Sequence, residues 1–338
     1  MRFVTVKSNP SYIGLTDGAR ILNLNAAAAR EGLTGLPATL EDYIRHADDF
    51  TAKVADIDRK FRAGAYEEYT IGYEDAVLAA PISRPASCRD GYAFRQHVAT
   101  ARRNRNAPMI PEFDQYPVFY FTNHHAILGP GDVPCMKDHF QKLDFELEAA
   151  IVVGRRGRNI RAKDADRYIF GYTIMNDLSA RVLQMEEMLL NLGPAKGKDF
   201  ATAIGPLLVT PDELDAFIAP THAGHTGAKH NLRMTARVNG VQVSEGNLNQ
   251  MDWTFAEILE RCAYGVDLMP TDVIGSGTVG TGCFLELNGT GLLNDPNYPV
   301  QWLRAGDVVE LEIEQLGVLR NRMVLEDDFS ILELKHKA

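Results

Sequence analysis

Three acidic residues alternate along the otherwise apolar stretch 143–153. Successive side chains of a strand point to opposite faces, so Asp144, Glu146 and Glu148 would share one face. Carboxylates in line repel one another, and burial would raise their pKa values. A hard divalent cation would neutralise them, as would a ring of Lys or Arg side chains. The remaining alternative is an exposed edge strand with a solvated acidic face, although the apolar run 149–153 favours burial.

Two predicted helices carry side chains of catalytic type. The first, from about residue 93 to 103, holds His97 and ends in arginines that suit the helix dipole. A single histidine on a short helix is more often structural than catalytic. The second helix, from about residue 180 to 190, carries Arg181 and Gln184 on one face near its start.

Two glycine-rich segments indicate places where backbone can approach a ligand. One is the loop 193–198, and the other, 275–280, matches the G-x-G-x-x-G pattern of dinucleotide sites. A dinucleotide fold needs a helix directly after this pattern, whose N-terminus faces the pyrophosphate. Residues 281–287 predict a further strand instead. We therefore interpret 275–280 as a tight connection beside a site rather than a nucleotide loop.

Composition and charge exclude several classes of protein. The chain has 338 residues, of which 45% are hydrophobic and 24% charged, with a net charge of -10. This acidity disfavours binding to nucleic acid or to anionic membranes. No apolar run is long enough to suggest a spanning helix or a signal peptide. The four cysteines are widely spaced, which favours a cytoplasmic protein without a zinc site or disulfide framework.

The pattern of elements predicts an α+β protein that is mainly β. Residues 1–80 are expected to form a small N-terminal domain, and residues 81–338 a strand-rich catalytic domain with short inserted helices. Within the larger domain we predict a hairpin at 232–243 around Asn-Gly, a helix at 255–263 and a strand pair within 308–325.

Taken together, these segments resemble the fumarylacetoacetate hydrolase family from about residue 87 to 286. Each motif is weak alone, but their joint order and spacing make a strong match. The resemblance implies a mixed β-roll or sandwich with short helices. The motifs are Asp90-Gly91-Tyr92-Ala93-Phe94-Arg95-Gln96-His97, Glu146-Leu147-Glu148, Asn176-Asp177-Leu178-Ser179-Ala180-Arg181 with Gln184, Gly197-Lys198-Asp199-Phe200, and Gly277-Thr278.

That family binds one Mg²⁺ or Ca²⁺ ion through four carboxylates, and Mn²⁺ is a further option. Oxygen ligands suit such hard cations, and the cation removes the repulsion noted above. The resemblance places Lys198 and Thr202 around the metal and leaves Asp144 outside the ligand set. By motif position the ligands are Asp90, Glu146, Glu148 and Asp177.

The resemblance also implies catalytic roles. His97 would be the general base, oriented by Glu286. Shorter family members place the acidic partner three residues after the histidine, where this chain has Thr100. Glu286 and the separate leading region therefore favour the fumarylacetoacetase type. The resemblance further implies that a developing oxyanion is stabilised by Arg181, Gln184 and Lys198. It assigns substrate binding to Tyr92 and Thr278.

The implied reaction is metal-dependent hydrolysis of a carbon–carbon bond in a β-diketo acid, with fumarylacetoacetate going to fumarate and acetoacetate as the leading case. Alternatives are an acylpyruvase, a 2-keto acid decarboxylase or an isomerase using the same metal-bound enolate, and a non-catalytic metal-stabilised β protein. The family usually forms homodimers, which we expect here.

Departures from the family pattern concern the substrate's far carboxylate. Asn106 replaces an arginine, for which Arg102, Arg103 or Arg105 would have to substitute. Expected tyrosines are replaced by Met188 or Leu189 on one helix and by His124 or His125 in a loop.

Overall fold

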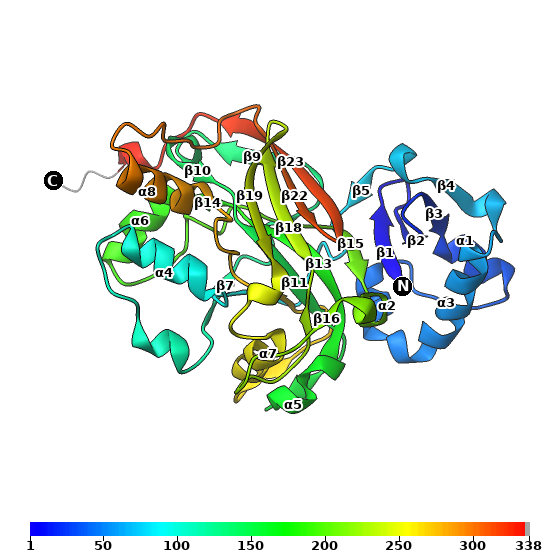
Figure 1. Cartoon of the computed structure of the whole chain (residues 1–338). Coiled ribbons are helices and arrows are strands. Elements are labelled where there is room, and N and C mark those ends of the chain that lie inside the picture. The colour runs from blue at the N-terminus through cyan, green and yellow to red at the C-terminus, as the bar shows by residue number, and fades with distance from the viewer. Residues whose placement is uncertain (335–338) are drawn as a thin grey trace.

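A long, mostly antiparallel sheet organises the protein, and the computed structural model describes residues 1–334 (Figure 1). Two short strands flank the main path, β5 (Leu78–Ala79) beside β1 and β8 (Ile127–Leu128) beside β15. The order along the path is β4 (Thr70–Gly72), β3 (Arg20–Asn23), β2 (Tyr12–Thr16), β1 (Arg2–Val6), β15 (Thr202–Val209), β13 (Ile169–Asp177), β11 (Leu147–Val153), β21 (Val273–Gly275), β6 (Cys88–Gly91) and β7 (Phe119–Thr122).

A second sheet contains the predicted hairpin and the predicted late strand pair. Its order is β19 (Val241–Asn247), β18 (Arg233–Val238), β22 (Val308–Ile313), β23 (Gly317–Asp327) and β9 (Gly131–Met136). Three short pairs complete the strands: β10 (Leu143–Asp144) with β14 (Ser179–Ala180), β12 (Gly157–Arg158) with β20 (Asp267–Leu268), and β16 (Ile218–Ala219) with β17 (Lys229–His230). The mixed fold, mainly β with short helices, is therefore confirmed.

The helices gather in three places around the sheets (Figure 1). Helices α1 (Leu24–Arg30), α2 (Leu40–Arg45) and α3 (Ala47–Arg62) accompany the first strands on the right of the view. Helices α4 (Arg95–Arg103), α6 (Arg181–Leu189) and α8 (Phe284–Asn294) lie at the opposite end. Helices α5 (Ala162–Ala165) and α7 (Phe255–Ala263) lie at the bottom, and α7 has the bounds that the sequence predicts.

Strand β11 is buried on both faces, which explains why its sequence is apolar without alternation. Ala149, Ile151 and Val153 belong to the core shared with the five-stranded sheet. Ala150 and Val152 belong to a second core that includes the helices of the first 62 residues. The sheet is therefore held rigidly where its acidic residues lie.

The first strands are continuous with the rest of the large sheet. Strand β1 pairs with β15 at Arg2↔Val209 and Phe3↔Leu208. The division at about residue 80 stays a prediction, and residues 335–338 of the predicted larger domain lie outside the described residues.

The predicted continuous strand over 143–153 is wrong, because β10 ends at Asp144 and β11 begins at Leu147. Two backbone N–H groups in the gap bond to side chains instead of to a neighbouring strand. Phe145 N donates to Asp144 Oδ1 over 3.0 Å, and Glu146 N donates to Asn176 Oδ1 over 3.0 Å. Asp144 lies outside the group of acids that includes Glu146 and Glu148.

The predicted strand over 281–287 is also wrong, because α8 begins at Phe284. Its first N–H groups are satisfied from far away in the sequence. Phe284 N donates to Asp144 Oδ1 over 2.7 Å, and Leu285 N donates to Asp144 Oδ2 over 2.9 Å. Because the capping residue is distant in the sequence, no local capping pattern predicts this helix.

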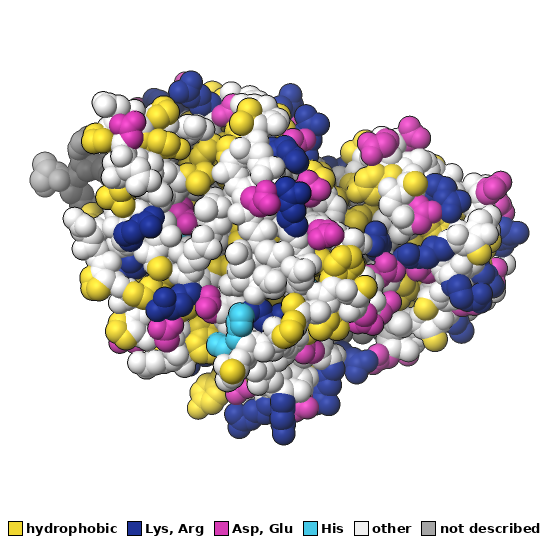
Figure 2. Space-filling view, viewed as in Figure 1, with side chains coloured by type: hydrophobic (Ala, Val, Ile, Leu, Met, Phe, Trp, Pro, Cys, Tyr) yellow, Lys and Arg dark blue, Asp and Glu magenta, His cyan; other side chains and the backbone are white. Residues whose placement is uncertain are grey.

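The face seen in Figure 2 carries acidic and basic side chains interspersed. Within residues 1–334, no helix has the length and apolarity needed to cross a bilayer. The four cysteines are buried and unpaired.

Candidate active site

Four buried carboxylates meet across four neighbouring strands, three of which carry them or end beside them. Asp90 lies on β6, Glu148 on β11 and Asp177 at the end of β13, while Glu146 directly precedes β11. One oxygen of each lies within 4.8 Å of the others. The sheet order β13, β11, β21, β6 thus converts distant sequence motifs into one cluster.

The crowding of these acids shifts their proton affinities. Burial, and then the charge of Asp177, raises the pKa of Asp90 to about 8. Burial and the neighbouring Asp90 raise the pKa of Glu148 well above its ordinary value. Gly277 N donates to both Asp90 Oδ1 and Glu148 Oε2 over 3.1 Å. Without a cation, both acids therefore hold a proton more readily than ordinary carboxyl groups do.

Lys198 supplies the positive charge on the other side of the cluster. Its Nζ lies 2.5 Å from Glu146 Oε2 and 2.6 Å from Asp177 Oδ2. Although burial alone would raise it, Lys198 and Arg181 hold the pKa of Glu146 below its ordinary value. Gly197 brings this loop against α6, since a Cβ there would lie 2.5 Å from the Gln184 backbone. The loop therefore lies close against α6, while its predicted approach to a ligand stays a prediction.

The second glycine-rich segment lies beside the same carboxylates. A Cβ at Gly275 would lie 2.4 Å from Asp90 Oδ1 and 3.0 Å from Glu148 Oε2. A side chain at this position would therefore displace the carboxylates of Asp90 and Glu148. The conclusion that this segment flanks a site agrees with the geometry, but the reason for rejecting a nucleotide loop is wrong, because a helix does follow it.

Two orphaned atoms indicate that the cluster fits a cation. Asp177 Oδ1 and Thr202 Oγ1 are buried and have no hydrogen-bond partner in residues 1–334. Asp177 Oδ2 is already held by Lys198 and by the Tyr120 hydroxyl, which donates over 2.5 Å. Oδ1 is thus left free for a metal. An oxygen-only donor set suits Mg²⁺, Ca²⁺ or Mn²⁺, which Asp90, Glu146, Glu148 and Asp177 would hold.

Arg181 lies between the cluster and the start of α8. Its Nε and Nη2 donate to Asp144 Oδ2 over 2.9 and 2.7 Å, and Nη2 also donates to Glu146 Oε1 over 2.8 Å. Its Nη1 donates to Gln184 Oε1 over 3.0 Å. Four of its five N–H bonds are therefore engaged, so one remains for a substrate oxygen. Asp144 is the structural partner of this arginine.

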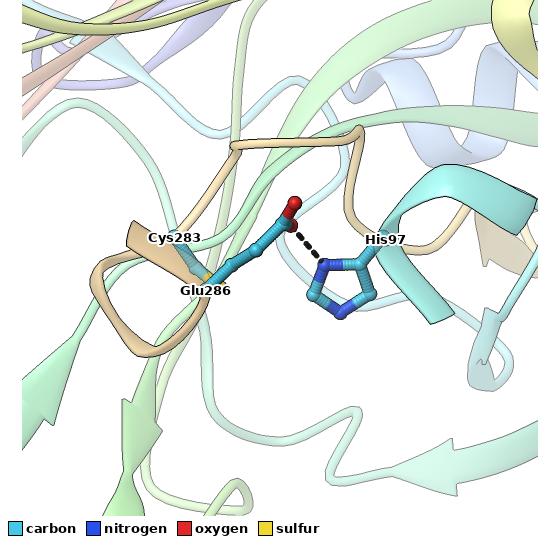
Figure 3. Close-up of side chains that lie close together, drawn as sticks. All are labelled: His97, Cys283 and Glu286. Carbon is cyan, nitrogen blue, oxygen red and sulfur yellow. Dashed lines mark hydrogen bonds and ion pairs between the residues drawn. The ribbon is translucent and has the colours of Figure 1, made fainter. Parts of the chain in front are cut away.

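His97 and Glu286 form a second buried group beside the carboxylates (Figure 3). His97 Nδ1 lies 2.7 Å from Glu286 Oε2. Because a carboxylate accepts hydrogen bonds, we assign the proton to Nδ1, which leaves Nε2 as an acceptor. Cys283 lies next to the pair, and burial raises the pKa of its thiol well above the ordinary value. The thiol therefore stays neutral, and Glu286 is the carboxylate that bonds the histidine directly.

A cavity of about 420 Å³ connects these groups. Among the residues predicted for the site, those lining it are Asp90, Tyr92, His97, Glu146, Arg181, Gln184, Lys198 and Thr278. Thr278 Oγ1 lies 3.3 Å from Glu148 Oε1, so it is close to the carboxylates as well as to the cavity. The edge of the Tyr92 ring contacts His97, with ring centroids 5.8 Å apart.

Of the residues proposed to replace missing family residues, some line the cavity and others lie away from it. Arg105 and Met188 line the cavity. Arg102 instead donates to Pro108 O, and Arg103 donates to Thr290 Oγ1. His124 and His125 stack on each other and are not among the residues that line this cavity.

Tyr120 is the site residue that sequence reasoning missed. Its hydroxyl bonds Asp177, and its side chain lines the cavity. The only signal was its place in a strand of aromatic residues, 119–121, which also fits ordinary packing. The role of Asp144 as a cap of α8 was equally invisible.

Comparisons with known proteins agree with this fold and site. The family model described as "Fumarylacetoacetate (FAA) hydrolase C-terminal" matches residues 87–324. The chain belongs to this family, and it is therefore a member of an enzyme superfamily that uses divalent metals.

Its relatives include "Oxaloacetate tautomerase FAHD2A, mitochondrial" of Homo sapiens, 31% identical over 93% of this chain and 87% of that protein. "Oxaloacetate tautomerase YisK" of Bacillus subtilis (strain 168) is 27% identical over 96% of this chain and 100% of that protein. Among solved structures, the fumarylacetoacetate hydrolase from psychrophilic Exiguobacterium antarcticum has a TM-score of 0.66 and 24% identity, covering 96% of this chain and 100% of the other. The fold is thus shared across relatives with different named activities.

Removal of divalent metal is expected to make stability fall as pH rises. In the metal-free protein Asp90 keeps a proton up to about pH 8, whereas the unfolded chain releases it near its ordinary pKa of about 4. Folded protein therefore binds more protons across that window, and unfolding becomes easier toward its upper end. Added metal should raise Tm, and more so at the upper end, because binding releases protons.

The measurement is thermal unfolding from about pH 5 to 8.5 with EDTA or with each of Mg²⁺, Ca²⁺ and Mn²⁺. The double variant Asp90→Asn, Glu148→Gln is the control and should lose both the metal effect and the pH slope. A wild-type Tm indifferent to metal at every pH would contradict the site.

Proposed function

We propose that the protein interconverts the keto and enol forms of a 2-keto diacid at a divalent metal, with oxaloacetate as the smallest substrate. The observation that carries the proposal is that His97, bonded to the buried Glu286, lines the same cavity as Asp90 and Glu146 of the carboxylate cluster. Two relatives, 31% and 27% identical over 93% and 96% of this chain, are named oxaloacetate tautomerases, which supports the substrate class.

Each side chain has a role in this reaction. When bound, a divalent cation would favour the enolate by withdrawing charge from the keto oxygen. His97 Nε2 accepts the proton from the carbon next to the keto group and delivers it to the keto oxygen, which becomes the enol hydroxyl; in the reverse direction it carries the hydroxyl proton back to carbon. Glu286 holds the ring and stabilises the imidazolium. The remaining N–H of Arg181, the Gln184 amide and the third N–H of Lys198 donate to substrate oxygens. Tautomers differ only in the position of one proton, so no co-reactant is needed.

Hydrolysis of a 3,5-diketo acid, with fumarylacetoacetate as the first example, is the second candidate. The cavity volume of about 420 Å³ favours it, because a four-carbon acid would not fill that space. Here His97 would take a proton from water, water oxygen would add to the carbonyl carbon, and the carbon–carbon bond would break. The leaving carbon would take the proton, which gives one carboxylic acid and one ketone. Decarboxylation of a 2-keto acid would use the same charge stabilisation.

One set of assays separates these reactions. Purified protein with Mg²⁺ or Mn²⁺ is expected to accelerate the decay of enol-oxaloacetate absorbance, and EDTA should abolish the acceleration. Diketo acids in ¹⁸O-labelled water report hydrolysis through labelled carboxylic acid, and evolved CO₂ reports decarboxylation. Labelled acid without tautomerase activity would reject the first candidate in favour of the second. If no assay shows turnover while metal still stabilises the fold, both reactions are rejected, and the protein is a metal-binding protein without these activities.

The homodimer and the cytoplasmic location remain predictions. Sedimentation of the metal-loaded protein tests the first of them directly.

A further inference from the structure

Glu187 lies on the last turn of α6 and bonds the backbone of the loop that leads to Lys198. Its Oε2 accepts from Ala195 N over 2.9 Å and from Gly197 N over 3.2 Å, and its Oε1 accepts from Lys196 N over 2.7 Å. Three consecutive backbone N–H groups therefore converge on one carboxylate. Successive N–H groups of this kind form an anion-binding concavity, and here the anion comes from the neighbouring helix.

The helix alone gives no reason for an acid at this position. The C-terminal end of a helix carries partial negative charge, so a carboxylate there is unfavourable. Residues 186–189 include no Lys or Arg that could offset it. The Glu187 side chain is only partly buried, so packing does not explain it either. Its three hydrogen bonds to the loop do.

The loop is fastened to α6 at two places. Ala180 N, directly before the helix, donates to Gly197 O over 2.8 Å, and Glu187 holds the N–H groups of 195–197 near the other end of the helix. Within the loop, Lys198 N donates to Ala195 O over 2.9 Å. The backbone of Lys198 is therefore fixed relative to the helix that carries Arg181.

Lys198 needs this support most when a divalent cation is bound. Its Nζ is held by ion pairs with Glu146 and Asp177. Both carboxylates belong to the cluster that suits a cation, which would compete for their oxygens and repel the ammonium. A lysine side chain is long and flexible, so its ammonium can move away once these ion pairs weaken. A fixed backbone limits that movement.

We propose that Glu187 is a positioning residue, which holds residues 195–197 against α6 and thereby keeps the Lys198 ammonium at the carboxylate cluster. The catalytic part of this inference rests on the proposed function, in which Lys198 donates to a substrate oxygen. Glu187 is not among the residues lining the cavity, so it acts through Lys198. The effect of removing Glu187 must therefore depend on the presence of Lys198.

A double-mutant cycle in kcat tests this dependence. Lys198→Met, which keeps most of the side-chain volume, is expected to lower kcat by about 10²-fold, as loss of one donor to a developing oxyanion does. Glu187→Ala should lower kcat by about tenfold, because the ammonium is then misplaced. Added to Lys198→Met, Glu187→Ala should change kcat by less than about twofold. Glu187→Gln should recover part of the loss, since its amide oxygen still accepts hydrogen bonds.

Two further measurements need no turnover. The Lys198 ammonium competes with a cation for the carboxylates, so calorimetry should show tighter Mn²⁺ binding, about threefold in Glu187→Ala and about tenfold in Lys198→Met. Glu187→Ala should add nothing to the Mn²⁺ affinity of Lys198→Met. Amide hydrogen exchange of residues 195–197 should be faster in Glu187→Ala than in the wild type, because their acceptor is gone.

Glu41 provides the matched control. Its Oε1 accepts from Ser83 N over 2.7 Å and from Arg84 N over 3.2 Å, so it also ties a loop to a helix. It lies on α2 and is not among the residues lining the cavity. Glu41→Ala should leave kcat, Mn²⁺ affinity and the exchange of 195–197 unchanged.

Full addition of the two single effects in either cycle would overturn the proposal, as would unaltered exchange of 195–197 in Glu187→Ala. The enol-oxaloacetate assay reports the proposed function separately. Non-additive Mn²⁺ affinities in a protein without tautomerase activity would support the positioning of Lys198 while rejecting that function.

Discussion

Replacing His97 by alanine is expected to lower kcat by about 10²–10⁴-fold, whichever of the two proton-transfer reactions the enzyme performs. His97 has its Nδ1 bonded to Glu286 and its ring facing the cavity, so its Nε2 is the acceptor that both mechanisms use. The side chain does not belong to the carboxylate cluster. Metal-induced stabilisation should therefore be retained. Steady-state kinetics together with thermal unfolding in Mn²⁺ measure both quantities on one preparation.

Glu286→Gln refines this expectation. The amide keeps a hydrogen bond but removes the charge that stabilises the imidazolium, so kcat should fall less than in His97→Ala. His125→Ala is the matched control, because that histidine is exposed and is not among the residues lining the cavity. Activity in His97→Ala close to that of the wild type would remove His97 from the mechanism.

Replacing Asp144 by alanine is expected to destabilise the protein by about 3–5 kcal/mol. The Asp144 and Arg181 side chains are 0% and 3% exposed, so the change leaves a buried guanidinium with Glu146 as its remaining carboxylate partner. It also removes the acceptor for two N–H groups at the start of α8. Because α8 carries Glu286, activity should fall along with stability. Urea unfolding of the metal-loaded protein gives the free energy.

An exposed ion pair provides the comparison for this change. Asp132 and Arg322 are 51% and 56% exposed, so Asp132→Ala should cost no more than about 1 kcal/mol. Asp144→Asn should lie between the two variants, since the amide oxygen can still accept from α8. If Asp144→Ala were no more destabilising than Asp132→Ala, Asp144 would not have the supporting role assigned to it.

The sequence was informative where function constrains residues close together in the chain. Glu146 and Glu148 are two positions apart, and Asp177 and Arg181 four, so each pair is visible as a local motif. The structure brings all of them to one cluster or its border. The family was recognisable for the same reason, and it is confirmed. The fold class followed from the family and from the strand-rich pattern.

Prediction failed where a distant residue determines local structure. Residues 284–287 look like a strand by composition, yet the Asp144 carboxylate caps them into a helix across 140 positions. The same carboxylate bonds Phe145 N and interrupts the strand that was predicted through it. Tyr120 was missed because its partner, Asp177, lies 57 residues away. No short window along the sequence contains Asp144 together with Phe284, or Tyr120 together with Asp177.

The pairing of β1 with β15 has a consequence for synthesis on the ribosome. Strands β1 to β4 can pair with one another once residue 72 has emerged, but β15 ends at Val209. Until then β1 has an open edge at Arg2 and Phe3, covered elsewhere only by β5 at Thr5 and Val6. At about 5–20 residues per second, this interval lasts on the order of ten seconds. Nascent chains thus present an unpaired strand edge, a natural contact for chaperones and a hazard where they are scarce.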